Sequence, residues 1–117
     1  MSRPSKPTSP LEPLEHEFAQ ERAAALGRLG RALEAALAAL HAFDASHPDR
    51  VAAAPDERQR RAALVAQASV ALWQFVVQRE SCGLRDMRLV LRDYGVPPEV
   101  AAQMGVLPGP APTRRRR

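Results

Sequence analysis

Several residue types are scarce in this sequence, and each shortage argues against a class of protein. Cys82 is the only cysteine in 117 residues, so no internal disulfide can form and a reducing cytosol is the natural setting. Aromatic residues make up 4% of the chain, and β-branched residues are also few. Alanine, leucine, glutamate and arginine dominate instead, a composition that predicts an all-α fold.

The sequence also lacks a recognisable membrane-spanning or secretory segment. The run Ala62–Gln78 carries no formal charge, but it has only 17 residues and contains three glutamines. A membrane-spanning helix needs about 20 predominantly apolar residues, so we expect this run to be a buried helix. Residues 1–10 are polar and proline-rich, without the apolar stretch of a secretory signal. We therefore expect a cytoplasmic protein with no membrane partner.

The net charge of +4 suggests an acidic partner, but the distribution of charge weakens this argument. The four C-terminal residues Arg114, Arg115, Arg116 and Arg117, here called the Arg tail, carry four of the 17 positive charges. When Arg3 and Lys6 are also left out, 11 positive charges face 13 negative ones between residues 11 and 107. The folded part is therefore neutral to slightly acidic, and we expect at most weak, salt-sensitive phosphate binding by the tail. A solvated tail without a role is the alternative.

The chain is long enough for one small domain or for one half of a dimer. Residues 1–10 contain three prolines and little to bury, and residues 108–117 combine proline with the Arg tail. We expect both segments to be disordered. A single helical domain is thus predicted over residues 11–107.

A long apolar stripe marks the first predicted helix, from about Pro13 to about Ala45. Leucines recur at steps of three and four, a spacing that puts them on one side of a helix and requires that side to be buried. Leu14 and Phe18 extend the stripe backwards, and Phe43 extends it forwards. The leucines of the stripe are Leu26, Leu29, Leu33, Leu37 and Leu40.

The second predicted helix begins near Asp56, after the prolines of the connection over residues 44–55, and stops at Gly83. Asp56–Arg60 and Glu57–Arg61 are spaced four apart in the favourable acid-first order, which predicts local ion pairs. Two shorter helices follow, over residues 84–94 and 99–104. The apolar face of the second helix is predicted to comprise Leu64, Val65, Ala68, Leu72, Phe75 and Val76.

These elements predict an all-α fold in which a long antiparallel helical hairpin is joined by two short C-terminal helices, packing as a bundle. We expect the two short helices to cover one end of the hairpin. Gly30, within the stripe, predicts either a notch that admits Trp73 or Phe75, or a tolerated kink. Trp73 itself is expected in the core, with an oligomer interface as the second interpretation.

Two observations favour self-association as a homodimer with a four-helix core. The first helix is longer than its partner can cover, and Gln67, Gln74 and Gln78 form an uncharged polar stripe where a solvated face would carry charge. The predicted interface comprises Leu26, Gly30, Leu33, Leu37, Leu40, Leu72, Trp73 and Val76.

No cluster of residues predicts a catalytic or cofactor site. Cys82 is a nucleophile only if His16, His41 or His47 lies beside it, and no motif for such a site surrounds it. A small, half-buried residue at a helix end is the better interpretation.

Metal binding and DNA reading are equally poorly supported. His16, Glu17 and Glu21 can share a helix face, as can His41 and Asp44, but no two histidines have the four-residue spacing of a zinc-binding helix. Residues 85–104 have a helix–turn–helix outline. Its second helix offers only Glu99 and Gln103 toward bases, so a hairpin folded back on the long helices is predicted instead.

Three segments resemble a known family. These are residues 24–31 (AALGRLGR), 75–85 (FVVQRESCGLR) and 92–100 (RDYGVPPEV). Together they are similar to a family of small bacterial proteins classed as a domain of unknown function, over most of residues 11–105. The resemblance implies a bacterial, helical protein and assigns no functional residues.

The sequence therefore predicts a non-enzymatic protein-interaction or self-associating module without a cofactor. The partner is expected to be a second copy or another protein. Weak binding of nucleic acid or another acidic surface through the Arg tail is the alternative.

Overall fold

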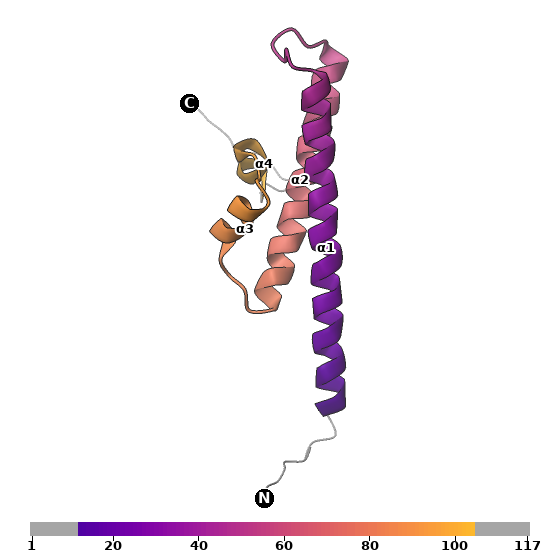
Figure 1. The fold of residues 1–117 in the computed structure, drawn as a ribbon, viewed down its shortest axis with the longest axis vertical. Coiled ribbons are helices and arrows are strands. Elements are labelled where there is room, and N and C mark those ends of the chain that lie inside the picture. The colour runs from indigo at the N-terminus through magenta and orange to yellow at the C-terminus, as the bar shows by residue number, and fades with distance from the viewer. Residues whose placement is uncertain (1–11, 105–117) are drawn as a thin grey trace, which may run out of the picture.

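The computed structural model describes residues 12–104, and this part of the chain is all-α (Figure 1). Helix α1 spans Glu12–Ser46 and α2 spans Pro55–Ser81, and the two run antiparallel as a long hairpin. Helix α3 spans Met87–Asp93 and α4 spans Pro98–Gln103. The predicted fold class is confirmed. The predicted leader and the Arg tail lie outside the described residues.

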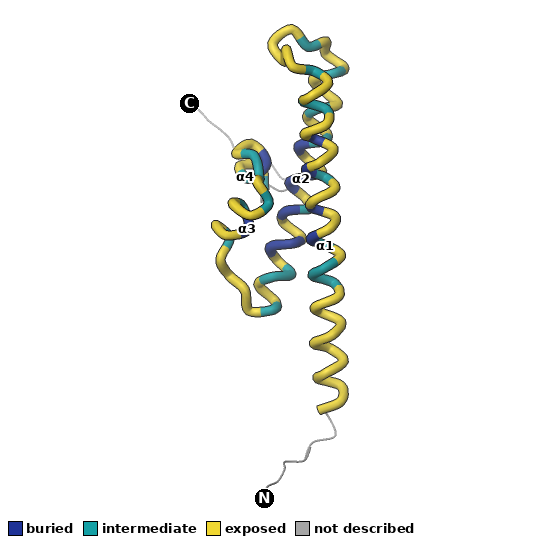
Figure 2. The backbone as a smooth tube through the Cα atoms, viewed as in Figure 1, coloured by how far each residue is buried: buried dark blue, intermediate teal, exposed yellow. Residues whose placement is uncertain are grey.

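The leucine stripe of α1 is buried against α2. Leu33, Leu37 and Leu40 are at most 4% exposed and form one cluster with Leu72 and Phe75 of α2. Fully burying a side chain of this size contributes about 1.5–3 kcal/mol. The buried residues lie along the middle of the hairpin (Figure 2), so burial of this seam is the main force that joins α1 to α2.

The N-terminal part of α1 extends beyond α2. Near the end of α2, the side-chain amide of Gln78 donates to the carbonyl oxygen of Arg22 at 3.5 Å, and residues 12–21 lie past this contact. Leu14 is 45% exposed and Phe18 58% exposed. The prediction that Leu14 and Phe18 continue the buried stripe is therefore wrong for the single chain, because α2 ends before it reaches these two residues.

Glycine, proline and acidic caps set the helix ends. Pro55 opens α2, and Glu57 accepts a hydrogen bond from the backbone N–H of Ala54 at 3.0 Å. Gly83 follows α2 with φ of 86°, a left-handed conformation that favours glycine. Helix α3 begins at Met87 rather than at the predicted residue 84, because Asp86 caps it by accepting from the N–H of Leu89 at 3.3 Å.

Helices α3 and α4 lie along the side of α2, so their predicted place over one end of the hairpin is wrong (Figure 1). The hydroxyl of Ser69, itself 5% exposed, donates to the carbonyl oxygen of Val100 at 2.9 Å. The side chain of Val100 is fully buried. A buried hydroxyl without a hydrogen-bond partner would weaken the apolar contact between α2 and α4, and this hydrogen bond supplies the partner. It also fixes the position of α4 on α2.

Gly30 forms the predicted notch, and Phe75 occupies it. A Cβ atom at Gly30 would lie 3.2 Å from Cε1 of Phe75 and 3.0 Å from the hydroxyl of Tyr94. The rings of Phe75 and Tyr94 meet edge to face at 5.2 Å. The notch thus lets two aromatic side chains approach the backbone of α1. Tyr94, at the end of α3, is a contact that the sequence did not predict.

We expect opposite stability changes at the two glycines inside α1. Gly27→Ala raises the free energy of unfolding by up to about 1 kcal/mol, because alanine favours helix and the new Cβ meets only the flexible Arg31 side chain at 3.5 Å. Gly30→Leu lowers it by about 1–3 kcal/mol, because the added atoms overpack the notch. Urea titration of both variants measures this. Equal effects at the two positions would contradict a filled notch.

Candidate functional site

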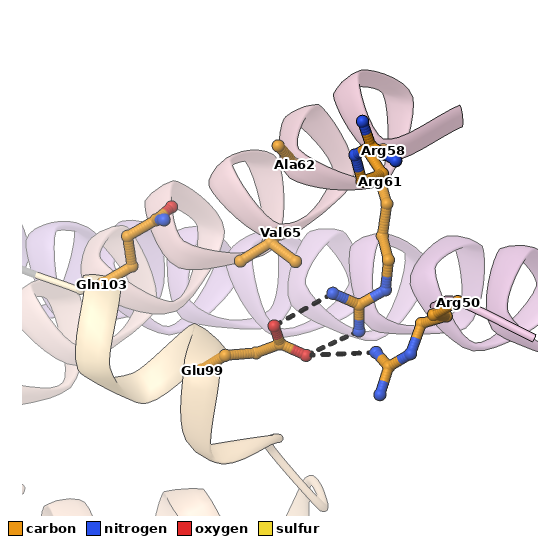
Figure 3. A pocket seen from close by; sticks show the side chains of 7 residues that line it. All are labelled: Arg50, Arg58, Arg61, Ala62, Val65, Glu99 and Gln103. Atoms are coloured by element: carbon orange, nitrogen blue, oxygen red, sulfur yellow. Dashed lines mark hydrogen bonds and ion pairs between the residues drawn. The ribbon is translucent and has the colours of Figure 1, made fainter. Parts of the chain in front are cut away.

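Arg61 joins three helices near the loop end of the hairpin. From the second turn of α2, its guanidinium donates to both carboxylate oxygens of Asp44 in α1, at 2.7 and 3.0 Å. It also donates to both carboxylate oxygens of Glu99 in α4, at 2.9 and 2.5 Å. Arg50, in the connection, lies 3.9 Å from the same two carboxylates. Figure 3 shows Glu99 between Arg61 and Arg50.

The local ion pairs predicted for the start of α2 are wrong. Glu57 caps the helix and lies 3.5 Å from Nε2 of His47 rather than pairing with Arg61. Arg60 lies over the ring of Phe43, 5.5 Å from its centroid, instead of pairing with Asp56. Partners elsewhere in the chain therefore replace the neighbours four residues away.

The arginine changes the titration of both carboxyl groups. Its hydrogen bonds hold the pKa of Asp44 below its usual range, although partial burial acts in the opposite direction. They lower the pKa of Glu99 for the same reason. The two carboxylates in turn raise the pKa of Arg61, Glu99 contributing most. Both carboxylates are therefore poor proton acceptors near neutral pH, and the arrangement acts as a clamp between helices.

A hollow of about 500 Å³ adjoins this clamp. Its lining combines residues of the clamp with four others, which are Arg58, Ala62, Val65 and Gln103 (Figure 3). Its lining contains no cysteine, histidine, serine or threonine, and Glu99, its one carboxylate, is held by Arg61. The hollow therefore carries no group suited to nucleophilic or general-base catalysis.

The side of α2 that faces away from the core is unusually apolar. Val70, Trp73 and Val77 are 52%, 44% and 44% exposed. With Ala63, Ala66, Gln67 and Gln74 they form one side of the helix, here called the outer face. All seven residues are exposed and uncharged. A shallow, mainly apolar groove of about 330 Å³ is lined by Ala66, Gln67, Val70, Ala71 and Gln74. A contiguous exposed apolar surface of this kind is typical of an interaction site.

The residues predicted as the interface fall mostly inside the hairpin. Gly30 and the leucines at 33, 37, 40 and 72 are buried between α1 and α2, as is Val76, while Leu26 is partly buried beside them. The core position predicted for Trp73 is wrong. Trp73 lies three residues from Val70 and four from Val77, and this spacing already placed it opposite the buried face of α2.

The remaining candidate residues have structural surroundings. Cys82 is half-buried and ends α2, its N–H directed at the carbonyl oxygens of Gln78 and Arg79. His47 stacks on Phe43 at 4.1 Å, while His16 and His41 are exposed. Between residues 12 and 104, no three histidine, cysteine or acidic side chains gather as a metal site would require.

The C-terminal segment folds back on α2, mainly through α4. Helix α4 has six residues. Its Glu99 is held by Arg61, and its Val100 is buried, so this helix is part of the packed structure.

None of the helices between residues 12 and 104 has the length and hydropathy needed to cross a membrane.

These features define a small all-α protein built on a helical hairpin. The chain belongs to a family described as a family of unknown function, DUF6665, whose model matches residues 1–112. The resemblance to a domain of unknown function is thereby confirmed. No curated protein matches the chain, and no solved structure matches it.

We expect the clamp to contribute pH-dependent stability. The pKa values of Asp44 and Glu99 are lowered in the folded protein, so the stabilisation is fully present above their unfolded-state values, about 4, and is lost as the pH falls below them. Arg61→Gln therefore lowers the free energy of unfolding by about 1–2 kcal/mol at neutral pH. The difference from wild type shrinks as the pH falls from about 5 to about 2.

Denaturation at several pH values, with Arg58→Gln as the control, checks this. Arg58 is exposed and donates to the carbonyl oxygen of Ala53 rather than to a carboxylate. Its substitution should give a difference from wild type that does not change with pH. A similar, pH-independent loss in Arg61→Gln would show that the clamp carboxylates do not titrate as described.

Proposed function

We propose that this chain is a non-enzymatic protein-interaction module that associates with itself. The outer face of α2 is the observation that carries this proposal. Val70, Trp73 and Val77 are each about half exposed, and no formal charge occurs between residues 62 and 78. Leaving such a surface in water forgoes the free energy of burying it. A partner that covers it would recover that energy.

The projecting part of α1 supports the same proposal. Leu14 and Phe18 are exposed beyond the end of α2, on a helix whose equivalent positions farther along pack against a partner. A second chain can supply the cover that α2 is too short to provide. The outer face and this projection are thus two separate apolar surfaces that association would bury.

The polar groups support a structural rather than a catalytic role. The carboxyl groups with a lowered pKa are held by Arg61, where they join helices. Cys82 ends α2, and His47 is engaged with Phe43 and Glu57. We place the protein in the cytoplasm, because its single half-buried cysteine suits a reducing compartment.

Sedimentation velocity of the full chain tests self-association. We expect a reversible dimer at tens of micromolar, a concentration at which most specific homodimers persist. Deletion of Arg114–Arg117 serves as the matched control and should leave the dimer unchanged, because the association is apolar. A monomer at that concentration would remove the proposal.

The Arg tail gives a second candidate, the binding of nucleic acid or another acidic surface. Four adjacent guanidinium groups attract phosphates without reading sequence, and the affinity falls with salt as counterions are released. Deletion of Arg114–Arg117 should abolish weak duplex binding at low salt, with folding and assembly intact. An affinity independent of salt, measured by fluorescence anisotropy, would reject this candidate.

A further inference from the structure

We infer that the outer face of α2 docks against the same face of a second copy, with the two α2 helices antiparallel and a twofold axis at Val70. This inference rests on the proposed self-association and names its surface and geometry. In such a pair, residues whose numbers add up to 140 lie at the same level along the two helices. The pairing can therefore be examined position by position.

Side-chain sizes are complementary in this register. The half of the outer face before Val70 carries Ala63 and Ala66, and the half after it carries Trp73 and Val77. Antiparallel pairing sets Val77 against Ala63 of the second copy, and Trp73 beside Ala66 of the second copy on the same flank of the pair. Large groups thus meet small ones. A parallel pair would instead set Trp73 against Trp73 and leave a gap between the alanines.

Charged residues are confined to the two ends of the face. Arg60 lies three residues before Ala63, and Glu80 lies three residues after Val77; both are exposed. The Arg60 guanidinium packs over Phe43 of its own α1, so we infer no ion pair between the copies. The centre of the face, where the two copies meet, is uncharged.

The other sides of α2 are already in use. α1 covers one side and α4 lies on the other (Figure 1), with Ser69 hydrogen-bonded to α4. The groove beside Val70, with Ala66 and Ala71 in its lining, offers space into which a side chain of a second copy can pack. The outer face thus has an apolar centre, a hollow and a charged edge, which is the usual anatomy of an interface.

The size of the face predicts a modest affinity. From Gln59 to Ser81 the helix is about 33 Å long, and a single helix pair of this length buries less surface than a standard stable complex. We therefore expect a reversible dimer with a dissociation constant in the micromolar range. Val70→Glu should raise this constant at least about tenfold, because it places two carboxylates at the twofold axis. Val70 is 52% exposed, so the variant should melt at the same temperature when monomeric.

Disulfide cross-linking of the full chain tests the geometry. With Cys82→Ser as the background, Val70→Cys should cross-link to itself under mild oxidation. Ala63→Cys and Val77→Cys should each stay monomeric alone, yet cross-link with each other when mixed. Ala38→Cys, at an exposed position of α1, is the control for random collisions.

The outcomes separate this inference from the proposed function. Self-linking of Ala63→Cys would show a parallel pair and overturn the inference. So would cross-linking of Val70→Cys no faster than that of Ala38→Cys. If wild type still sediments as a dimer in either case, self-association stands and its surface lies elsewhere. A monomeric wild type overturns both.

Discussion

Burial of the α1 leucine seam against α2 is the constraint on which the rest of the structure depends. It holds α2 in one rotational setting, because only one side of that helix matches Leu33, Leu37 and Leu40. Once this setting is fixed, Ser69 and Arg61 point toward α4. The outer face is then the side of α2 that remains.

Helix α2 therefore uses three different sides for three different contacts. One side closes the hairpin, a second receives α3 and α4, and the third is apolar and exposed. Arg61 binds carboxylates from α1 and α4 at once, so the first two sides are locked to each other. Restricting charge to the ends of the helix keeps its middle available for apolar contacts on every side.

Much of the fold follows from local patterns, because the signals are short-range. The three- and four-residue steps of the leucines predict α1 and its buried side, and Pro55 and Gly83 mark the ends of α2 within a residue or two. The sequence pattern predicts a start of α3 that is three residues too early, since Leu84 fits a helical pattern as well as Met87 does. The cap at Asp86 decides the boundary, and its strength depends on geometry.

The candidate site depends on contacts that spacing cannot reveal. Asp44 and Glu99 lie 17 and 38 residues from Arg61, whereas Glu57 lies at the distance at which helix neighbours pair. The place of Trp73 was readable from its spacing, but its size in an uncharged run suggested the core. The exposure of Phe18 depends on the point along α1 at which α2 ends. That point is set by how the two helices pack, so the sequence of either helix alone does not predict it.

The manner in which α4 is attached sets an order of assembly. The connection between Ser46 and Pro55 is short, so closing the hairpin costs little loop entropy. A six-residue helix has no stability of its own, and its anchors, Ser69 and Arg61, are in place only after α2 has formed on α1. Helix α4 therefore depends on the assembled hairpin for its stability. Lifting α4 would expose Val100, which is fully buried in the core, while the leucine seam between α1 and α2 keeps its own contacts.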